Sequence, residues 1–361
     1  MENTTTIKLK PQAGGWLFAY IILSLPGFIL SIMVLVLIVI LTLGGLAAAS
    51  TASKTTQEVD SLEYEFVDGN KNSKNKILSY DMNGSILSGG AGVTMSELQS
   101  NIYNDKINAD FKKIKEDNNI KAVLFKMDTP GGEVVAAEEI GDSINDLVLA
   151  KNQPKSVFYW GNVVASGGVF ITTKVKNNYV VASPYGESGS IGVITRIPDL
   201  QGLYDKIGVK WRVYKSAVSK DYGSEARDPT QDENAFIQAQ IDKTYNHFVD
   251  IVSTGRNIDR DKVLSFANGF VYQNEESKNL GLLDELGSYS QSYRKLAQFS
   301  KLNENDYQVV KLKKKSDFIT DLLGQNAKAS IVSSFLGVDA SSLNKLNLKG
   351  NMYLYDPRFV S

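Results

Sequence analysis

Hydrophobic residues are concentrated near the N-terminus in a run without any charge. No Asp, Glu, Lys or Arg lies between Lys10 and Lys54, and residues 26–49 are almost entirely apolar. A helix of about 20 apolar residues is long enough to cross the hydrocarbon core of a membrane. Lys8 and Lys10 precede the run, so the positive-inside rule places the N-terminus in the cytoplasm and the rest of the chain outside. We therefore predict a single transmembrane helix, with residues 1–25 cytoplasmic or interfacial.

A cleaved signal peptide is the alternative interpretation of this segment. Small residues follow the apolar run at residues 47–53 (AAASTAS), as a signal peptidase requires. The apolar core of a signal peptide is about 7–15 residues long, however, and this run is longer. An anchor that stays attached is therefore the expectation.

Beyond residues 50–75, which are polar and are expected to form a linker, segments of strand type alternate with segments of helical periodicity. This alternation is typical of βαβ units and predicts an α/β fold with a largely parallel sheet. Strands are expected at residues 76–81, 122–127, 156–160, 179–182, 191–195 and 211–214, with 308–313 as an edge strand. Helices are expected at residues 104–117, 133–149, 231–254, 259–267 and 316–336.

Composition and charge exclude several classes of function. The chain of 361 residues has 39 Lys and Arg against 40 Asp and Glu, which argues against nucleic-acid binding, because that function needs an excess of cations. The absence of Cys rules out disulfides, thiolate metal sites and a Cys nucleophile. A single His gives no basis for a His-rich metal site. We therefore expect neither a metal ion nor another cofactor.

Glycine-rich segments follow the predicted strands at residues 128–132 (DTPGG), 165–168 (ASGG) and 186–192 (GESGSIG). Ligands of open α/β sheets bind beyond the carboxyl ends of the strands. Ser166 lies there, between a strand and a Gly-Gly helix start, and is a candidate nucleophile. The N–H groups of Gly167 and of Gly131 or Gly132 are candidate oxyanion donors. A helix cap is the alternative role for this serine.

A serine nucleophile needs a general base. The single histidine, His247, falls in a predicted helix beside Phe248, in an ordinary packing stripe, so a position on the helix surface is expected. A lysine can act as the base if burial or nearby cations keep its amine neutral. Lys215 and Lys220 are the candidates, and the pattern of residues alone does not choose between them.

The glycine-rich segments belong to a longer series of motifs in a fixed order. The series comprises TPGG (129–132), ASGGVFI (165–171), SGSIGV (188–193), KSAVSKD (215–221), FVDIVSTGR (248–256), GFVY (269–272) and GLLDELG (281–287). Together with the N-terminal anchor, it resembles the signal peptide peptidase A (SppA) family of membrane-anchored serine peptidases. The resemblance implies a ClpP/crotonase-like βαβ superhelical domain behind a single N-terminal transmembrane helix.

The resemblance also implies a Ser–Lys dyad. The family's nucleophile falls on Ser166, and its general base falls on Lys220 rather than Lys215. The serine that hydrogen-bonds the base falls on Ser190. Because the base lysine is the second one of its motif, the resemblance makes the choice that the residue pattern left open.

The oxyanion donors of the family fall on the N–H groups of Gly132 and Gly167. The departures from the family's motifs are mild. Ala217 replaces a glycine, Phe270 replaces the usual arginine of the GRVY motif, and residues 169–170 replace an aromatic pair. None of these changes removes a catalytic group, so an active enzyme is expected.

The resulting prediction is a membrane-anchored serine endopeptidase with its peptidase domain at residues 76–300 and a C-terminal elaboration at 301–361 that provides oligomer contacts. It is expected to cleave signal-peptide remnants or other hydrophobic peptides outside the cytoplasmic membrane. It is also expected to form a homo-oligomeric ring. A catalytically silent ring scaffold and a crotonase-fold CoA-ester enzyme are the alternatives. The second fits poorly, because CoA thioesters are cytoplasmic.

Overall fold

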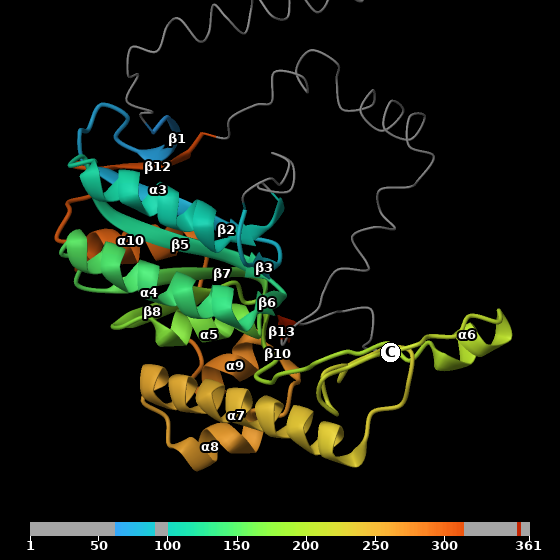
Figure 1. The fold of residues 1–361 in the computed structure, drawn as a ribbon. Coiled ribbons are helices and arrows are strands. Elements are labelled where there is room, and N and C mark those ends of the chain that lie inside the picture. Colours follow the sequence, from blue (N-terminus) through green and yellow to red (C-terminus); the bar gives the residue numbers. More distant parts are fainter. Residues whose placement is uncertain (1–61, 91–99, 314–351, 355–361) are drawn as a thin grey trace, which may run out of the picture. The chain divides into compact units, whose positions relative to one another are not determined.

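The structure is a computed structural model that describes residues 62–90 and 100–313 with their side chains and residues 352–354 by their backbone (Figure 1). The segments predicted to form the membrane anchor (26–49) and the last amphipathic helix (316–336) lie outside these residues. Within the described residues, no helix combines the length and the apolar character needed to cross a membrane.

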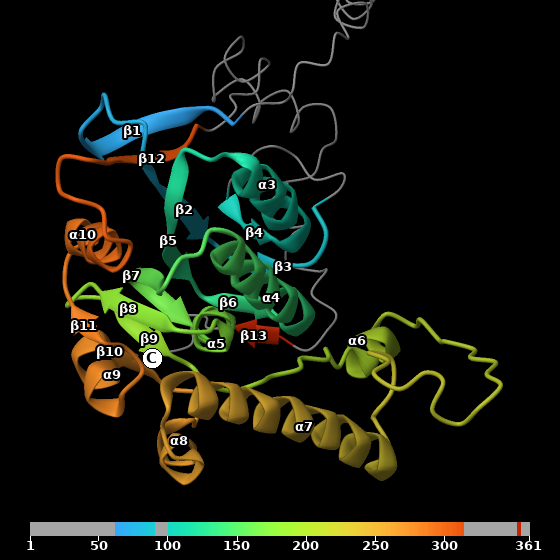
Figure 2. The same ribbon diagram turned by 90° about the vertical axis from the view of Figure 1, so that its left-hand side faces the viewer.

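One large sheet organises the fold (Figures 1 and 2). In the order in which they lie side by side, its strands are β1 (Tyr64–Gly69), β12 (Gln308–Leu312), β2 (Lys76–Asn83), β5 (Ile120–Thr129), β7 (Ser156–Ala165), β8 (Asn178–Ala182) and β11 (Glu285–Leu286). Every pair from β12 to β11 is parallel, whereas β1 runs antiparallel to β12. The last residues of β7 pair with β9 (Glu187–Gly189), which pairs with β10 (Val271–Gln273).

Helices cover both faces of this sheet (Figure 2). One face carries α3 (Asn104–Glu116), α4 (Val134–Ala150) and α5 (Gly167–Lys174), and the other carries α10 (Tyr289–Phe299). Outside α5 lies α7 (Gln231–Arg256), which contacts α8 (Arg260–Phe266), while α9 (Asn274–Leu280) contacts β9 to β11. Because the central strands are buried on both faces, they are nearly continuous apolar runs, which is the pattern that predicted them.

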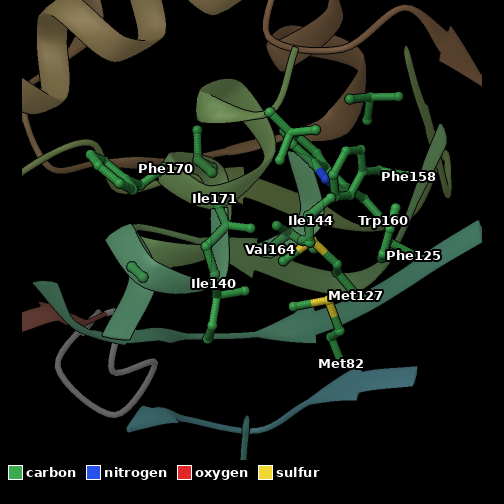
Figure 3. Close-up of a cluster of buried hydrophobic side chains, with 14 of the residues drawn as sticks. Met82, Phe125, Met127, Ile140, Ile144, Phe158, Trp160, Val164, Phe170 and Ile171 are labelled. Atoms are coloured by element: carbon green, nitrogen blue, oxygen red, sulfur yellow. The ribbon is translucent and has the colours of Figure 1, made fainter. Parts of the chain in front are cut away.

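Successive residues of a central strand pack into different cores. In β5, Phe125 belongs to the core under α3, α4 and α5, whereas Leu124 belongs to the core under α10. The larger core reaches the first turns of α5, where Ile171 lies beside the labelled cluster (Figure 3) and Phe170 packs against Phe248 of α7, with ring centroids 5.3 Å apart. The start of α5 therefore rests on a fully buried apolar cluster.

A small second sheet begins where β5 ends. Its strands lie in the order β13 (Met352–Leu354), β6 (Gly131–Glu133), β3 (Ile86–Leu87) and β4 (Ile102–Tyr103). β13 is antiparallel to β6, with Tyr353 opposite Gly132. The edge of β6 thus binds an extended segment of chain through backbone pairing.

The strands predicted at residues 191–195 and 211–214 are wrong. Ile191 is buried in the larger core, whereas residues 192–195 and 211–214 belong to a long connection leading to α7, residues 192–230, which we call the excursion and which contains α6 (Gln201–Lys206). None of the residues in the excursion is buried. Their apolar side chains imitate a strand pattern, but neither segment forms a strand, and the first contains only an isolated bridge residue at Ile194.

Two strands differ from the sequence-based expectation in their place. Residues 64–69 fall in the predicted linker, yet they form β1; none of them is buried, so no apolar alternation marked the strand. The segment 308–312 was expected at an edge, yet β12 lies between β1 and β2. The other strands and helices predicted within the described residues are confirmed, with β7 continuing as far as Ala165.

Candidate active site

Ser166 lies in the sharp turn between β7 and α5. Its backbone has φ 52° and ψ −112°, a conformation that L-residues rarely adopt and that costs about 1–3 kcal/mol. Its N–H donates to the carbonyl of Gly189 at 2.8 Å, and its carbonyl accepts from the N–H of Phe170 at 2.9 Å. These two hydrogen bonds hold the serine in a strained strand-to-helix turn, which is the geometry of a nucleophile elbow.

The Ser166 hydroxyl has no hydrogen-bond partner among the described residues, although the residue is only 1% exposed. In particular, it makes no capping hydrogen bond to an N–H group of α5. A buried hydroxyl that lacks a partner costs about 1–3 kcal/mol, so neither capping nor core packing explains a serine at this position. The structure therefore argues against the cap role and for a hydroxyl that is available to react.

Backbone segments approach each other closely around Ser166. A Cβ atom on Gly132 would lie 1.9 Å from the carbonyl oxygen of Ile86 in β3, so glycine is required there. A Cβ atom on Gly168 would lie 2.6 Å from Cγ2 of Thr129, the last residue of β5. The TPGG and ASGG segments are therefore packed together at one end of the sheet.

The candidate oxyanion donors lie at the same end of the sheet. Gly167 is the first residue of α5, and the N–H groups of a first helical turn have no partner within the helix. Gly132 lies in β6, which contacts α5. Two backbone N–H groups in such a place can stabilise a developing oxyanion. Their role here stays a prediction.

Ser190 follows β9 in the way that Ser166 follows β7. The two strands pair with Ala165 opposite Gly189, so the two serines leave the sheet as neighbours. Ser190 also has a φ of 52°, is 7% exposed, and donates its N–H to the carbonyl of Phe270 at 2.6 Å. The structure thus brings Ser190 to Ser166, while its hydrogen bond to a lysine stays a prediction.

A buried polar network holds β9 in place. The hydroxyl of Ser188 is hydrogen-bonded to Asn274 at 2.7 Å and to Ser277 at 2.8 Å. Asn274 donates its Nδ2 to the carbonyl of Ser183 at 2.8 Å. Because Ser188, Asn274 and Ser277 are completely buried, each needs the others to satisfy its polar atoms. Sequence reasoning missed this network, since single polar residues far apart give no periodic signal.

Asp128 is a second residue that sequence reasoning did not single out. β7 bulges opposite it, where the pairing register of β5 and β7 shifts. The carboxylate accepts from Nδ2 of Asn162 at 2.7 Å and from the N–H of Val163 at 3.2 Å. Beyond the bulge, the last residues of β7 pair with β9, and Ser166 follows directly after them. The only signal for this role was the position of Asp128 at the start of the DTPGG segment.

Lys220 and Ser166 lie in different segments of the chain. Lys220 lies in the excursion, which runs out beyond the sheet through α6 and returns to the N-terminus of α7 (Figures 1 and 2). Its side chain is exposed and forms no ion pair with any described residue. Lys215 lies in the same excursion, with its ammonium 2.7 Å from the carboxylate of Asp221. Because the Ser166 hydroxyl has no hydrogen-bond partner among the described residues, the pairing of Ser166 with Lys220 stays a prediction.

His247 lies on α7 and is exposed. Its Nε2 is 3.3 Å from the carboxylate of Glu138 on α4, and its ring packs against Phe170 at 5.8 Å between centroids. The predicted position on a helix surface is confirmed. In the ranges 62–90 and 100–313, no group of His, Asp and Glu side chains is arranged to hold a metal ion.

Comparisons with known proteins place this geometry in a family. The model of Peptidase family S49 matches residues 149–303. A predicted protease of Synechocystis sp. is 32% identical over 229 residues, which cover 63% of this chain and 81% of that protein. A predicted signal peptide peptidase SppA of Enterococcus faecium is 32% identical over 232 residues, covering 64% of this chain and 66% of the relative. Among solved structures, a ClpP1 mutant of Listeria monocytogenes aligns with a TM-score of 0.38 and 13% identity, over 61% of this chain and 94% of that one.

The matched region contains the candidate site. Ser166, Ser190 and Lys220 all lie within residues 149–303. A further relative, the chloroplastic serine protease SPPA of Arabidopsis thaliana, is 28% identical over 230 residues, covering 63% of this chain and 32% of that protein. The prediction that the chain is a serine peptidase is therefore confirmed. The chain belongs to peptidase family S49.

Proposed function

We propose that the chain is a membrane-anchored endopeptidase that uses Ser166 as its nucleophile and Lys220 as its general base. The apolar run at residues 26–49 would be the anchor, and a ClpP/crotonase-like domain would act outside the cytoplasmic membrane on signal-peptide remnants or other hydrophobic peptides. One observation carries the proposal. Ser166 is held in a strained turn at a helix start, and its buried hydroxyl has no partner among the described residues.

The edge of β6 supports an extended peptide as the substrate. This edge already pairs with β13, whose residues run antiparallel to residues 131–133. β13 also contacts α5, the helix that begins after Ser166. A substrate strand that took the place of β13 on this edge would have its main chain fixed by backbone hydrogen bonds, which is a common mode of peptide recognition. Its scissile carbonyl would then lie near Ser166.

The chemistry of the proposed dyad is acyl transfer. The hydroxyl oxygen of Ser166 attacks the scissile carbonyl carbon while the neutral amine of Lys220 accepts the hydroxyl proton. The N–H groups of Gly132 and Gly167 hold the oxyanion of the tetrahedral intermediate. The C–N bond then breaks, and the lysine returns the proton to the leaving amine. Water attacks the resulting ester with Lys220 again as the base, and the acid product leaves with Ser166 restored.

Lys220 reaches the nucleophile, in this proposal, from a neighbouring copy of the chain. The excursion stands away from the sheet, and its exposed apolar side chains include Leu203, Ile207, Trp211, Val213, Tyr214 and Val218. A cluster of exposed apolar side chains of this kind marks a contact surface. A head-to-tail contact that closes by rotation gives a ring. Each site of this homo-oligomeric ring would combine Ser166 and Ser190 of one copy with Lys220 of the next.

The proposal is tested by hydrolysis of an extended hydrophobic peptide. The full-length chain in detergent should cut the peptide at an internal bond, and mass spectrometry should identify the two resulting fragments. The Ser166→Ala variant should produce neither fragment. Cleavage that continues in the Ser166→Ala variant would refute the proposed nucleophile. The absence of any cleavage by the wild-type chain, over a panel of hydrophobic peptides, would favour the silent scaffold.

A further inference from the structure

The excursion that carries Lys220 is held by polar contacts rather than by a hydrophobic core. None of residues 192–230 is buried. A segment that buries no side chain gains little from hydrophobic packing to offset the conformational entropy of a fixed shape. Other interactions must therefore set the position of its functional lysine.

One arginine bridges the excursion to α7. The guanidinium of Arg227 donates to the carboxylate of Asp221 from Nε at 3.1 Å and from Nη2 at 2.8 Å. It also donates to the carboxylate of Glu233 from Nη1 at 2.9 Å and from Nη2 at 2.8 Å. Glu233 is only 2% exposed. Paired hydrogen bonds to both carboxylates use the planar fork that is particular to arginine.

The two carboxylates belong to the segments that this bridge must join. Asp221 directly follows Lys220 in the chain. Glu233 lies in the first turn of α7 and accepts from the N–H of Thr230 at 2.9 Å, as part of a capping box. The ring of Tyr222 also packs edge-on against Phe236 of α7, with centroids 5.8 Å apart. Both residues that follow Lys220 are therefore attached to the same rigid helix.

We propose that Arg227 is a positioning residue for the general base: by bridging Asp221 to Glu233, it holds Lys220 at a fixed place relative to α7. The inference rests on the proposed function, because it takes Lys220 as the base. α7 contacts α5, the helix that begins directly after Ser166. The position of Lys220 is therefore fixed relative to α7, a helix that packs against the rest of the folded domain.

The charges of the bridge persist at neutral pH. Hydrogen bonds from Arg227 lower the pKa of Glu233 to about 2 and hold the pKa of Asp221 well below its usual range. Both carboxylates therefore remain ionised under the conditions in which a peptidase works. Lys215 adds a contact to Asp221 at 2.7 Å, but among the described residues it forms no ion pair with Glu233. It cannot replace the link to α7.

The test measures peptide hydrolysis by the full-length chain in detergent. Arg227→Ala should lower kcat about 100-fold, the loss typical of a catalytic group displaced by about 1 Å, and should leave KM unchanged because the edge of β6 is untouched. Arg212→Ala is the matched control. It removes an exposed arginine of the same excursion that forms no ion pair with a described residue, and should leave kcat near the wild-type value.

Rescue separates positioning from folding. Millimolar guanidinium ion should restore much of the kcat of Arg227→Ala by occupying the gap between the two carboxylates. Guanidinium is a denaturant, so it would not restore an enzyme that had merely lost stability. Arg227→Lys should stay slow, because an ammonium cannot bind two carboxylates with paired hydrogen bonds. If Arg227→Ala does not fold, Glu233→Gln, which keeps an acceptor for the cap, should show the same loss of kcat at constant KM.

The outcomes distinguish this inference from the function on which it rests. A wild-type kcat in Arg227→Ala beside an inactive Lys220→Ala would overturn the positioning role and leave the dyad intact. A loss that guanidinium does not restore, accompanied by a matching rise in KM, would also overturn it. An active Lys220→Ala would overturn the proposed dyad itself.

Discussion

Ser166 and Ser190 share a φ of 52° and leave the ends of two paired strands as neighbours. Each is fixed by its own N–H, which donates to Gly189 in the first case and to Phe270 in the second. Conformations of this kind are strained in residues other than glycine and are kept only where the surrounding structure enforces them. The fold therefore holds two serines in costly conformations at one place, which is the arrangement of a functional site.

Replacing Ser166 with alanine should abolish hydrolysis without lowering stability. The substitution removes a buried hydroxyl that has no partner, a group that costs about 1–3 kcal/mol, so the unfolding midpoint should stay the same or rise. Ser188→Ala is the matched control, because this equally buried hydroxyl is bonded to Asn274 and Ser277. It should be destabilised by about 1–3 kcal/mol in thermal unfolding followed by circular dichroism. A Ser166→Ala variant less stable than Ser188→Ala would show that the Ser166 hydroxyl is structural.

Alanine substitutions of the two lysines in the KSAVSKD motif should differ sharply in their effect on peptide hydrolysis. Lys220→Ala should be about as inactive as Ser166→Ala, because the members of a dyad act as a unit. Lys215→Ala should keep substantial activity, because Asp221 retains its hydrogen bonds to Arg227. Steady-state kinetics on one peptide substrate measures both. If Lys215→Ala is the inactive variant and Lys220→Ala is not, the general base has been assigned to the wrong lysine.

Mixed rings should recover activity if the dyad joins two copies. Full-length Ser166→Ala and Lys220→Ala chains should each be inactive alone, whereas rings assembled from both should regain part of the wild-type rate. In such rings some sites combine an intact serine with an intact lysine from the neighbour. Light scattering should show the same oligomeric mass for all three samples. An unchanged zero rate in confirmed mixed rings, or a monomer with full activity, would contradict the shared site.

The contribution of Glu233 to stability should disappear in acid. Its pKa falls from the ordinary 4.5 to about 2 in the folded protein, so the unfolded chain takes up the proton at a higher pH than the folded one. The contribution is therefore complete above a pH of about 4.5 and is lost as the pH falls towards about 2. Urea unfolding of wild type and Glu233→Gln over this range measures the difference in the free energy of unfolding. A difference that increases with acidity would contradict the ion pair.

The parts of the fold that the sequence predicted are those that bury apolar surface. β2, β5 and β7 are buried on both faces, so their residues form apolar runs with a clear strand length. β1 buries no residue, so nothing in its composition separates it from a linker. The apolar residues around Trp211 led to a strand being predicted where none exists, because they are exposed and pair with no strand of the described residues.

The candidate site was predictable only in part for a related reason. The glycines beside Ser166 mark a close approach of backbone segments, which is a local signal. The course of the excursion that carries Lys220 depends on the whole fold, and no local pattern encodes it. The bridge from Asp221 through Arg227 to Glu233 joins residues without a helical or strand period, so it emerges only from the folded structure.

Covalent trapping can show whether Ser166 is the nucleophile. A serine-reactive fluorophosphonate is added to the full-length chain in detergent, and the modified peptide is located by mass spectrometry. We expect a single label on Ser166, slow labelling in Lys220→Ala, and no label in Ser166→Ala. A label on another serine, or wild-type hydrolysis by a chain whose Ser166 remains unmodified, would contradict it.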